Sequence, residues 1–142
     1  ENSKLTSLNI SNNKHLFKLT NTINLNIFSN LTNLDCSNTD IIDYLPDCLN
    51  NLTYLDCSNN NLTRLPDNLH KLTRLYCNGN KLTCLPNNLD NLVSLECSSN
   101  KLNSISLCNL NKLVNLCIFD NEISHLSYNN NNNNDNSSNY LT

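Results

Sequence analysis

Eight cysteines are the residues of this 142-residue chain most able to do chemistry. Four of them, Cys36, Cys57, Cys77 and Cys97, recur about every 20 residues in similar surroundings. Such a series is compatible with disulfide bonds, with a zinc site or with buried reduced thiols. If the four positions are equivalent on neighbouring strands, their thiols form a ladder with a spacing of about 4.8 Å.

The alternatives place different demands on the chain. A disulfide framework needs paired cysteines in loops or at the ends of the domain, and an oxidising compartment. A zinc site needs four converging ligands, commonly from Cys-x-x-Cys pairs, whereas this chain has no such pair and a linear ladder does not converge. We therefore expect buried reduced thiols in place of leucine, which indicates a reducing compartment. Cys48, Cys84 and Cys108 are expected on return segments, and Cys117 on a strand.

Catalytic constellations are not evident in the sequence. His15, His70 and His125 occupy non-equivalent positions, and one glycine excludes most phosphate-binding loops. Asp35 and Asp56 could approach each other on adjacent strands as a glycosidase pair does, but they would lie on an open face that does not exclude water. We expect no enzymatic activity, no cofactor and no metal.

The elements that would position these residues are copies of one unit. Residues 52–71 and 72–91 match at a constant interval, through Leu52, Leu55, Cys57, Asn60, Leu62, Leu65, Pro66 and Leu69 in the first copy. Self-similarity of this period predicts a solenoid, in which each copy buries the apolar face of its neighbour.

Within one unit, the spacing predicts a strand, a turn and a return segment. Leu55 and Cys57 lie two residues apart, so both point to the core while Tyr54 and Asp56 point away. Pro66 favours a short irregular or 3₁₀-like return. The turn asparagines are expected to hydrogen-bond the backbone of their own or the next repeat; they are Asn60, Asn80, Asn100 and Asn121.

The pattern L-x-x-L-x-C-x-x-N-x-L-x-x-L-P-x-x-L-x-x resembles the short leucine-rich repeat of about 20 residues. The resemblance implies an α/β solenoid, a right-handed horseshoe with a parallel β-sheet on its concave side and irregular or 3₁₀ segments on its convex side. It also implies a function in recognising another macromolecule across the sheet. Cysteine replaces the usual aliphatic residue at one core position.

We expect a repeat array at residues 1–128, with about six repeats that start near residues 5, 31, 52, 72, 92 and 113. The first repeat is longer, as is expected of an end repeat. Residues 129–142 are expected to form an asparagine-rich linker or tail, because residues 129–139 have little to bury. Tyr140-Leu141-Thr142 resembles the start of a further repeat, and a chain that opens on Glu1 is expected to be an excised piece.

Composition limits the classes of partner that the chain can bind and indicates its cellular location. A net charge of −3 without a basic cluster argues against nucleic acid and anionic membranes, and there is no transmembrane-length apolar run. We also expect no small-molecule substrate. Asparagine makes up about a quarter of the residues, a bias that resembles proteins of amoebae or of giant DNA viruses. The expected location is intracellular and cytoplasmic, which for a viral protein is the host cytoplasm.

These observations predict a non-catalytic protein–protein interaction module or scaffold that binds a partner on its concave sheet face. The residues expected to bind are Asp35, Tyr54, Asp56, Arg74, Tyr76, Glu96 and Phe119. Two alternatives stay open: a secreted or surface receptor, and the substrate-targeting arm of a larger enzyme such as a ubiquitin ligase. Five Asn-x-Ser/Thr sequons are compatible with secretion, but the composition alone yields about six by chance.

Overall fold

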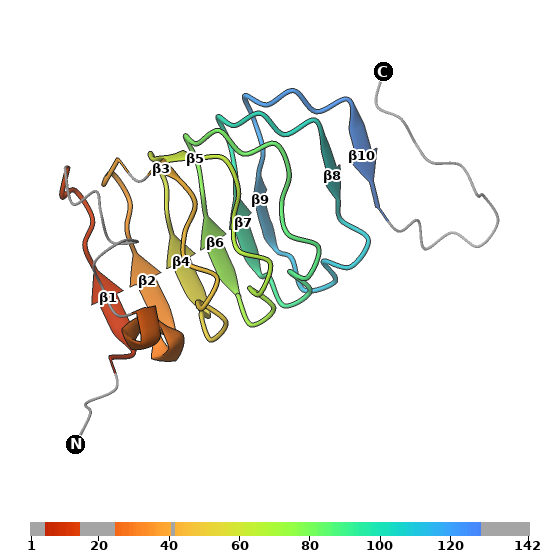
Figure 1. Cartoon of the computed structure of the whole chain (residues 1–142). Helices are drawn as coiled ribbons and strands as arrows, with labels where there is room; N and C mark the ends of the chain where they lie inside the picture. Colours follow the sequence, from red (N-terminus) through yellow and green to blue (C-terminus); the bar gives the residue numbers. More distant parts are fainter. Residues whose placement is uncertain (1–4, 15–24, 41, 129–142) are drawn as a thin grey trace.

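A parallel sheet of six short strands forms one wall of the molecule (Figure 1). The computed structural model describes residues 5–14, 25–40 and 42–128. Each strand of this main sheet starts two residues after an expected repeat start. In spatial order the strands are β1 (Ser7–Asn9), β2 (Asn33–Asp35), β4 (Tyr54–Asp56), β6 (Arg74–Tyr76), β7 (Ser94–Glu96) and β9 (Asn115–Cys117). The predicted parallel-sheet solenoid is confirmed.

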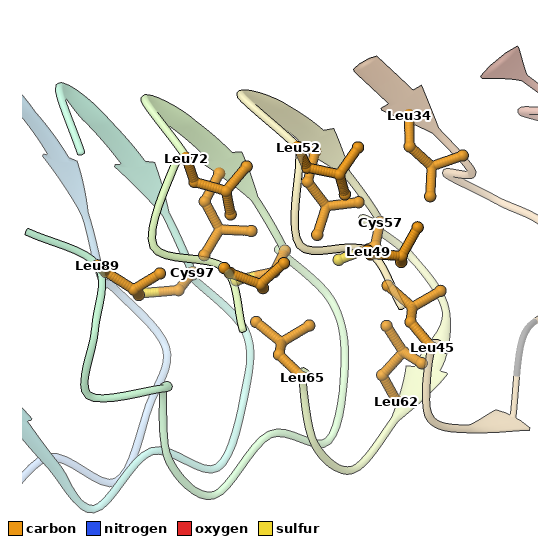
Figure 2. Close-up of a cluster of buried hydrophobic side chains, with 14 of the residues drawn as sticks. Leu34, Leu45, Leu49, Leu52, Cys57, Leu62, Leu65, Leu72, Leu89 and Cys97 are labelled. Atoms are coloured by element: carbon orange, nitrogen blue, oxygen red, sulfur yellow. The ribbon is translucent and has the colours of Figure 1, made fainter. Parts of the chain in front are cut away.

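The register of the sheet aligns one leucine from every repeat. Leu8, Leu34, Leu55, Leu75, Leu95 and Leu116 pair in sequence across the six strands. Between the sheet and the return segments, these leucines pack with leucines that precede and follow each strand (Figure 2). In the two central repeats, every equivalent of Leu52, Leu55, Cys57 and Leu62 is fully buried. The core is therefore one continuous column rather than a separate cluster in each repeat.

The return segments form the opposite wall and are mostly irregular (Figure 1). Two short parallel ladders lie in them, β3 (Ile42–Asp43) with β5 (Asn61–Leu62) and β8 (Ser104–Ser106) with β10 (His125–Ser127). The sequence analysis did not foresee these ladders. Within the described residues, the 3₁₀ helix η1 (Leu25–Asn30) belongs to the long first repeat, and no Pro-containing return is 3₁₀.

Proline explains where the β8–β10 ladder can form. Pro66 and Pro86 lack a backbone N–H, so their segments cannot complete a parallel ladder. The equivalent positions of the last two repeats hold Ser106 and Ser127, and Leu107 N donates to Ser127 O at 2.7 Å. The change from proline to serine thus converts an irregular return into a paired strand.

A left-handed residue precedes each turn position. Asn12, Asn38, Asn59, Gly79, Ser99 and Asp120 have φ between 54° and 62°. Glycine adopts this conformation at low cost, and asparagine and aspartate tolerate it better than most residues. The abundance of asparagine therefore has one structural cause that the repeat makes visible.

The turn asparagines join each repeat to the repeat before it. Asn80 Nδ2 donates to Cys57 O at 3.0 Å in the preceding repeat and to Cys77 O at 3.1 Å in its own. Its Oδ1 accepts from Leu62 N at 3.0 Å, again in the preceding repeat. The bond within its own repeat was expected from the sequence, whereas the other two bonds reach the preceding repeat and not the next one. The reason is that the amide reaches across the turn toward carbonyls already placed by the previous strand.

The same arrangement recurs at Asn60, Asn100 and Asn121. Asn100 bonds Cys77 O, Cys97 O and Leu82 N, and Asn121 bonds Cys97 O, Ile118 O and Leu102 N. In the second repeat Thr39 takes the turn position, where its hydroxyl lies within donating distance of two acceptors, Cys36 O at 2.7 Å and Asn60 Oδ1 at 3.1 Å. Each turn side chain replaces hydrogen bonds that water would otherwise make.

The repeat that starts at residue 113 is less buried than the central repeats. Leu113, Leu116, Ile118 and Ile123 are half-buried, although they match fully buried positions of the central repeats. The predictions for residues 129–142 and for His15 lie outside the described residues.

Candidate functional site

The predicted binding residues lie on the face of the main sheet that points away from the core, which we call the outer sheet face. Two rows of side chains cross it. The first row is Asn33, Tyr54, Arg74, Ser94 and Asn115, and the second is Asp35, Asp56, Tyr76, Glu96 and Cys117. Six of the seven predicted residues are in these rows, and Phe119 lies two residues after the end of β9.

An aromatic pair occupies the middle of the outer sheet face. The rings of Tyr54 on β4 and Tyr76 on β6 lie with centroids 5.7 Å apart and planes at 74°, an edge-to-face contact. Partial burial raises the pKa of the Tyr54 hydroxyl, and the nearby charges of Asp56 and Asp35 raise this pKa further. The Tyr54 hydroxyl therefore stays protonated, and the ring pair forms an amphipathic surface.

The carboxylates beside this pair are held by local hydrogen bonds. Asp35 Oδ1 accepts from Ser37 N at 3.1 Å, and Asp56 Oδ1 accepts from Ser58 N at 3.0 Å. Glu96 Oε2 accepts from Asn78 Nδ2 at 3.0 Å. Asp35 and Asp56 therefore also serve as turn residues, a role that the Asp-x-Ser spacing could have signalled.

Four serines that strand alternation would leave exposed are instead buried. Ser37 and Ser58 turn back to bond the aspartates, while Ser98 N donates to Asn78 Oδ1 at 2.8 Å. Ser94 is a short side chain between the longer Arg74 and Asn115. These serines support the outer sheet face and contribute little accessible surface to it.

Charge on this face is not neutralised by ion pairs. Among the described residues, the one salt bridge joins Arg64 and Asp47 at 3.4 Å on the return side. The exposed Arg74 is the single cation in the two rows, against Asp35, Asp56 and Glu96. The N-terminal half of the outer sheet face is therefore acidic.

The C-terminal part of the face is apolar. Phe119 is 69% exposed and Val114 is 76% exposed. Val93 is also exposed, and so is the thiol-bearing Cys117. The sequence analysis included Phe119 but missed the two valines, which replace threonines of the earlier repeats just before each strand.

The ladder of Cys36, Cys57, Cys77 and Cys97 consists of buried free thiols. Burial raises the pKa of the Cys97 thiol to about 12, and it raises the pKa of Cys57 and Cys77 well above the ordinary value. A buried neutral thiol is a poor nucleophile and a poor metal ligand. Within residues 5–14, 25–40 and 42–128, no group of three or more His, Cys, Asp or Glu side chains is placed to hold a metal ion.

The same described ranges contain no helix of the length and apolar character that a membrane span requires. The family model for leucine-rich repeats, in two copies, matches residues 50–90. The chain has the leucine-rich repeat fold.

Three solved leucine-rich repeat structures are similar to the chain. The functional domain of InlJ from Listeria monocytogenes, which includes a cysteine ladder, is 30% identical with a TM-score of 0.72, over 86% of this chain and 27% of that one. A leucine-rich repeat protein from Leptospira interrogans is 29% identical with a TM-score of 0.71, over 87% of this chain and 33% of that one. The leucine-rich effector YopM from Yersinia pestis is 26% identical with a TM-score of 0.60, over 70% of this chain and 35% of that one.

This chain thus spans about a third or less of the length of the first two structures. The comparison with curated proteins found no match. Leucine-rich repeat proteins are generally non-catalytic interaction modules.

Proposed function

We propose that the chain is a non-catalytic module that binds a protein partner on the outer sheet face. The observation that carries this proposal is the edge-to-face pair of Tyr54 and Tyr76 at the centre of an open sheet, beside carboxylates that form no ion pair with any described residue. Tyrosine and arginine are enriched at interface positions that contribute most binding energy. Proteins of this fold are typically protein-interaction modules.

The shape of the face supports binding over catalysis. Asp35 and Asp56 lie on adjacent strands of an open sheet, and each accepts a backbone hydrogen bond. A catalytic pair needs a site that excludes water and positions a reacting bond. An open face of alternating aromatic and acidic side chains instead suits a large, complementary protein surface.

Capture of a partner from the native cell, followed by measurement of its affinity, tests the proposal. Alanine at Tyr54, Tyr76 or Glu96 should each weaken binding by at least about 1 kcal/mol without lowering the melting temperature. Asp67→Ala and His70→Ala on exposed return positions are the matched controls. Normal binding by the first set together with loss of binding by the controls would exclude the outer sheet face.

We further propose an intracellular, cytoplasmic location, because the ladder thiols are free and buried. Titration of the denatured protein from its native source should return all eight thiols of the sequence. A lower count would instead favour a secreted or surface receptor. An asparagine-rich chain of this kind also fits a source with an AT-rich genome, including a virus that acts in the host cytoplasm.

A further inference from the structure

The outer sheet face changes chemistry along the solenoid. The position before each strand holds Thr32, Thr53 and Thr73 in the N-terminal half, and each hydroxyl donates to the backbone of the preceding repeat. The next two repeats hold Val93 and Val114 at this position, and both are exposed. The edge of the face where strands begin is therefore polar over β2–β6 and apolar over β7–β9.

The position after each strand changes in the same direction. Ser37 and Ser58 follow β2 and β4 and are occupied by hydrogen bonds to Asp35 and Asp56. Phe119 follows β9 and is exposed. Two independent positions of the repeat thus become apolar at the same end of the sheet.

Two of the three carboxylates in the two rows, Asp35 and Asp56, lie at the opposite end, and the third, Glu96, lies on β7. Asp35 and Asp56 pair directly across β2 and β4, so two like charges lie side by side. Among the described residues, Asp56 accepts one hydrogen bond, through Oδ1, so its Oδ2 can accept from a partner. Like charges on adjacent strands destabilise each other, and a cation placed between them relieves this repulsion.

We infer that the partner presents a segment that crosses the strands, with Lys or Arg over Asp35 and Asp56 and a large apolar side chain over Val114 and Phe119. This inference rests on the proposed binding function of the outer sheet face. The Tyr54–Tyr76 pair lies between the two ends and contacts the middle of the segment. The partner therefore binds in one direction along the solenoid.

The sheet also sets the spacing of the partner residues. Strands in a sheet lie about 4.8 Å apart, so the three to four intervals from β2–β4 to β9 span roughly 15–19 Å. An extended chain advances about 3.3 Å per residue, so the cation and the apolar side chain are separated by about four to six residues.

Selection from a phage-displayed library of random 12-residue peptides tests this inference directly. We expect enriched peptides to carry Lys or Arg about four to six positions from Leu, Ile, Phe or Trp. One enriched peptide is then synthesised with a fluorophore, together with a Lys/Arg→Gln analogue and an analogue in which the apolar residue is Ser. Fluorescence anisotropy gives the three dissociation constants.

Two variants of the chain separate the two ends of the face. Asp35→Asn with Asp56→Asn keeps an oxygen that accepts from Ser37 N and Ser58 N, and it loses only the exposed bond from Asn9 Nδ2 to Asp35 Oδ2, so we expect the fold to be retained. This double variant should raise the dissociation constant of the parent peptide about 10-fold and leave that of the Gln analogue unchanged. Val114→Thr with Phe119→Ser should weaken the parent about 10-fold and leave the Ser analogue unchanged. Asp67→Asn with Asp90→Asn is the charge-matched control on exposed return positions.

The outcomes separate this inference from the proposed function. One outcome is that selected peptides bind the parent chain but not its Tyr54→Ala and Tyr76→Ala variants, and yet have no regular spacing between Lys or Arg and an apolar residue. This result overturns the inference and leaves the proposed function in place. Peptides that bind those tyrosine variants normally overturn both. An empty selection overturns the inference for a linear segment, and partner capture then decides the proposed function separately.

Discussion

The central repeats and the last repeat contain the same residue types in different environments. In residues 52–91, the leucines that flank and occupy each strand are fully buried, whereas Leu113, Leu116, Ile118 and Ile123 are half-buried. A central leucine is covered by a repeat on each side, and its counterpart after residue 113 is covered by a described repeat on one side. Burial in this solenoid is therefore a property of neighbours, and each repeat contributes stability mainly through its interfaces.

The largest expected effect is a difference in unfolding free energy between leucine substitutions at one aligned position of two repeats. Leu75→Ala should lower the free energy of unfolding by about 2 to 5 kcal/mol, because it removes buried surface and leaves a cavity. Leu116→Ala, at the same position on β9, should cost roughly 1 kcal/mol, because part of that surface is already in water. Equilibrium denaturation with urea measures both, and equal losses would contradict the dependence on neighbours. Cys77→Ala should cost less than Leu75→Ala; a greater loss would indicate a bond or metal at the ladder.

The turn asparagines give the second comparison. Asn80→Ala leaves Leu62 N and Cys57 O without their bonds in a buried turn, at a cost of about 1 to 3 kcal/mol for each group left unpaired. Asn121→Ala should cost less, because its bonds are partly exposed and water replaces them. Thermal unfolding of both variants, with Asn88→Ala as a control, is the measurement. A melting temperature for Asn80→Ala equal to that of the control would contradict the proposed role.

The buried ladder thiols should make the free energy of unfolding depend on pH. The last repeat does not contribute to this dependence, because it has Ile118 at the ladder position. The pKa of Cys97 is about 12 in the folded chain, raised by burial from an ordinary value of 9.0. The unfolded chain therefore loses this proton first. The stability that depends on the protonated thiol is complete below about pH 9 and is lost as the pH rises from there towards 12.

One such thiol accounts for about 1.4 kcal/mol per pH unit in that window. Cys97→Val should therefore reduce the loss of stability between pH 8.5 and pH 10.5 by about 2 kcal/mol. Leu102→Val is the control, because it alters the core at every pH alike. Urea denaturation at a series of pH values tests this expectation, and identical slopes for the parent and Cys97→Val would contradict it.

The smallest effects concern the left-handed position before the turn. Gly79→Ala should lower stability by roughly 1 kcal/mol, because φ is 62° and a Cβ atom would lie 2.5 Å from Asn59 Oδ1. Ser99→Gly, at the equivalent position with φ 54°, should raise stability by about 0.5 kcal/mol. Differential scanning calorimetry resolves both changes. A stabilising Gly79→Ala would show that the turn relaxes without strain.

Much of the fold could be predicted because the core positions recur at a fixed interval in the sequence. Leu55, Leu75 and Leu95 recur at a fixed spacing, and strand alternation then places Tyr54 and Tyr76 on the opposite face. The local hydrogen bonds could not be read in the same way. Whether Ser58 faces water or bonds Asp56, and whether Asn80 reaches backward or forward, depends on backbone distances between repeats.

The outer sheet face was predicted from strand alternation alone. Its apolar residues outside the strands were harder to predict. Val93 and Val114 lie outside the strands, so a count of outward strand positions does not include them. A column-by-column comparison of threonine with valine would have found both residues. The β8–β10 ladder coincides with serine in place of proline at Ser106 and Ser127, a difference that was present in the sequence, whereas the β3–β5 ladder lies in repeats that keep Pro46 and Pro66.

The backward reach of the turn asparagines bears on how the chain is made. Because Asn80 completes hydrogen bonds to Cys57 O and Leu62 N, the repeat that begins at residue 52 is finished only when residue 80 has been added. A nascent chain leaving the ribosome therefore always carries one repeat whose turn awaits the following one. During synthesis from the N-terminus, the turn hydrogen bonds of each repeat are completed only after the next repeat has been made. Each new repeat therefore stabilises the one before it.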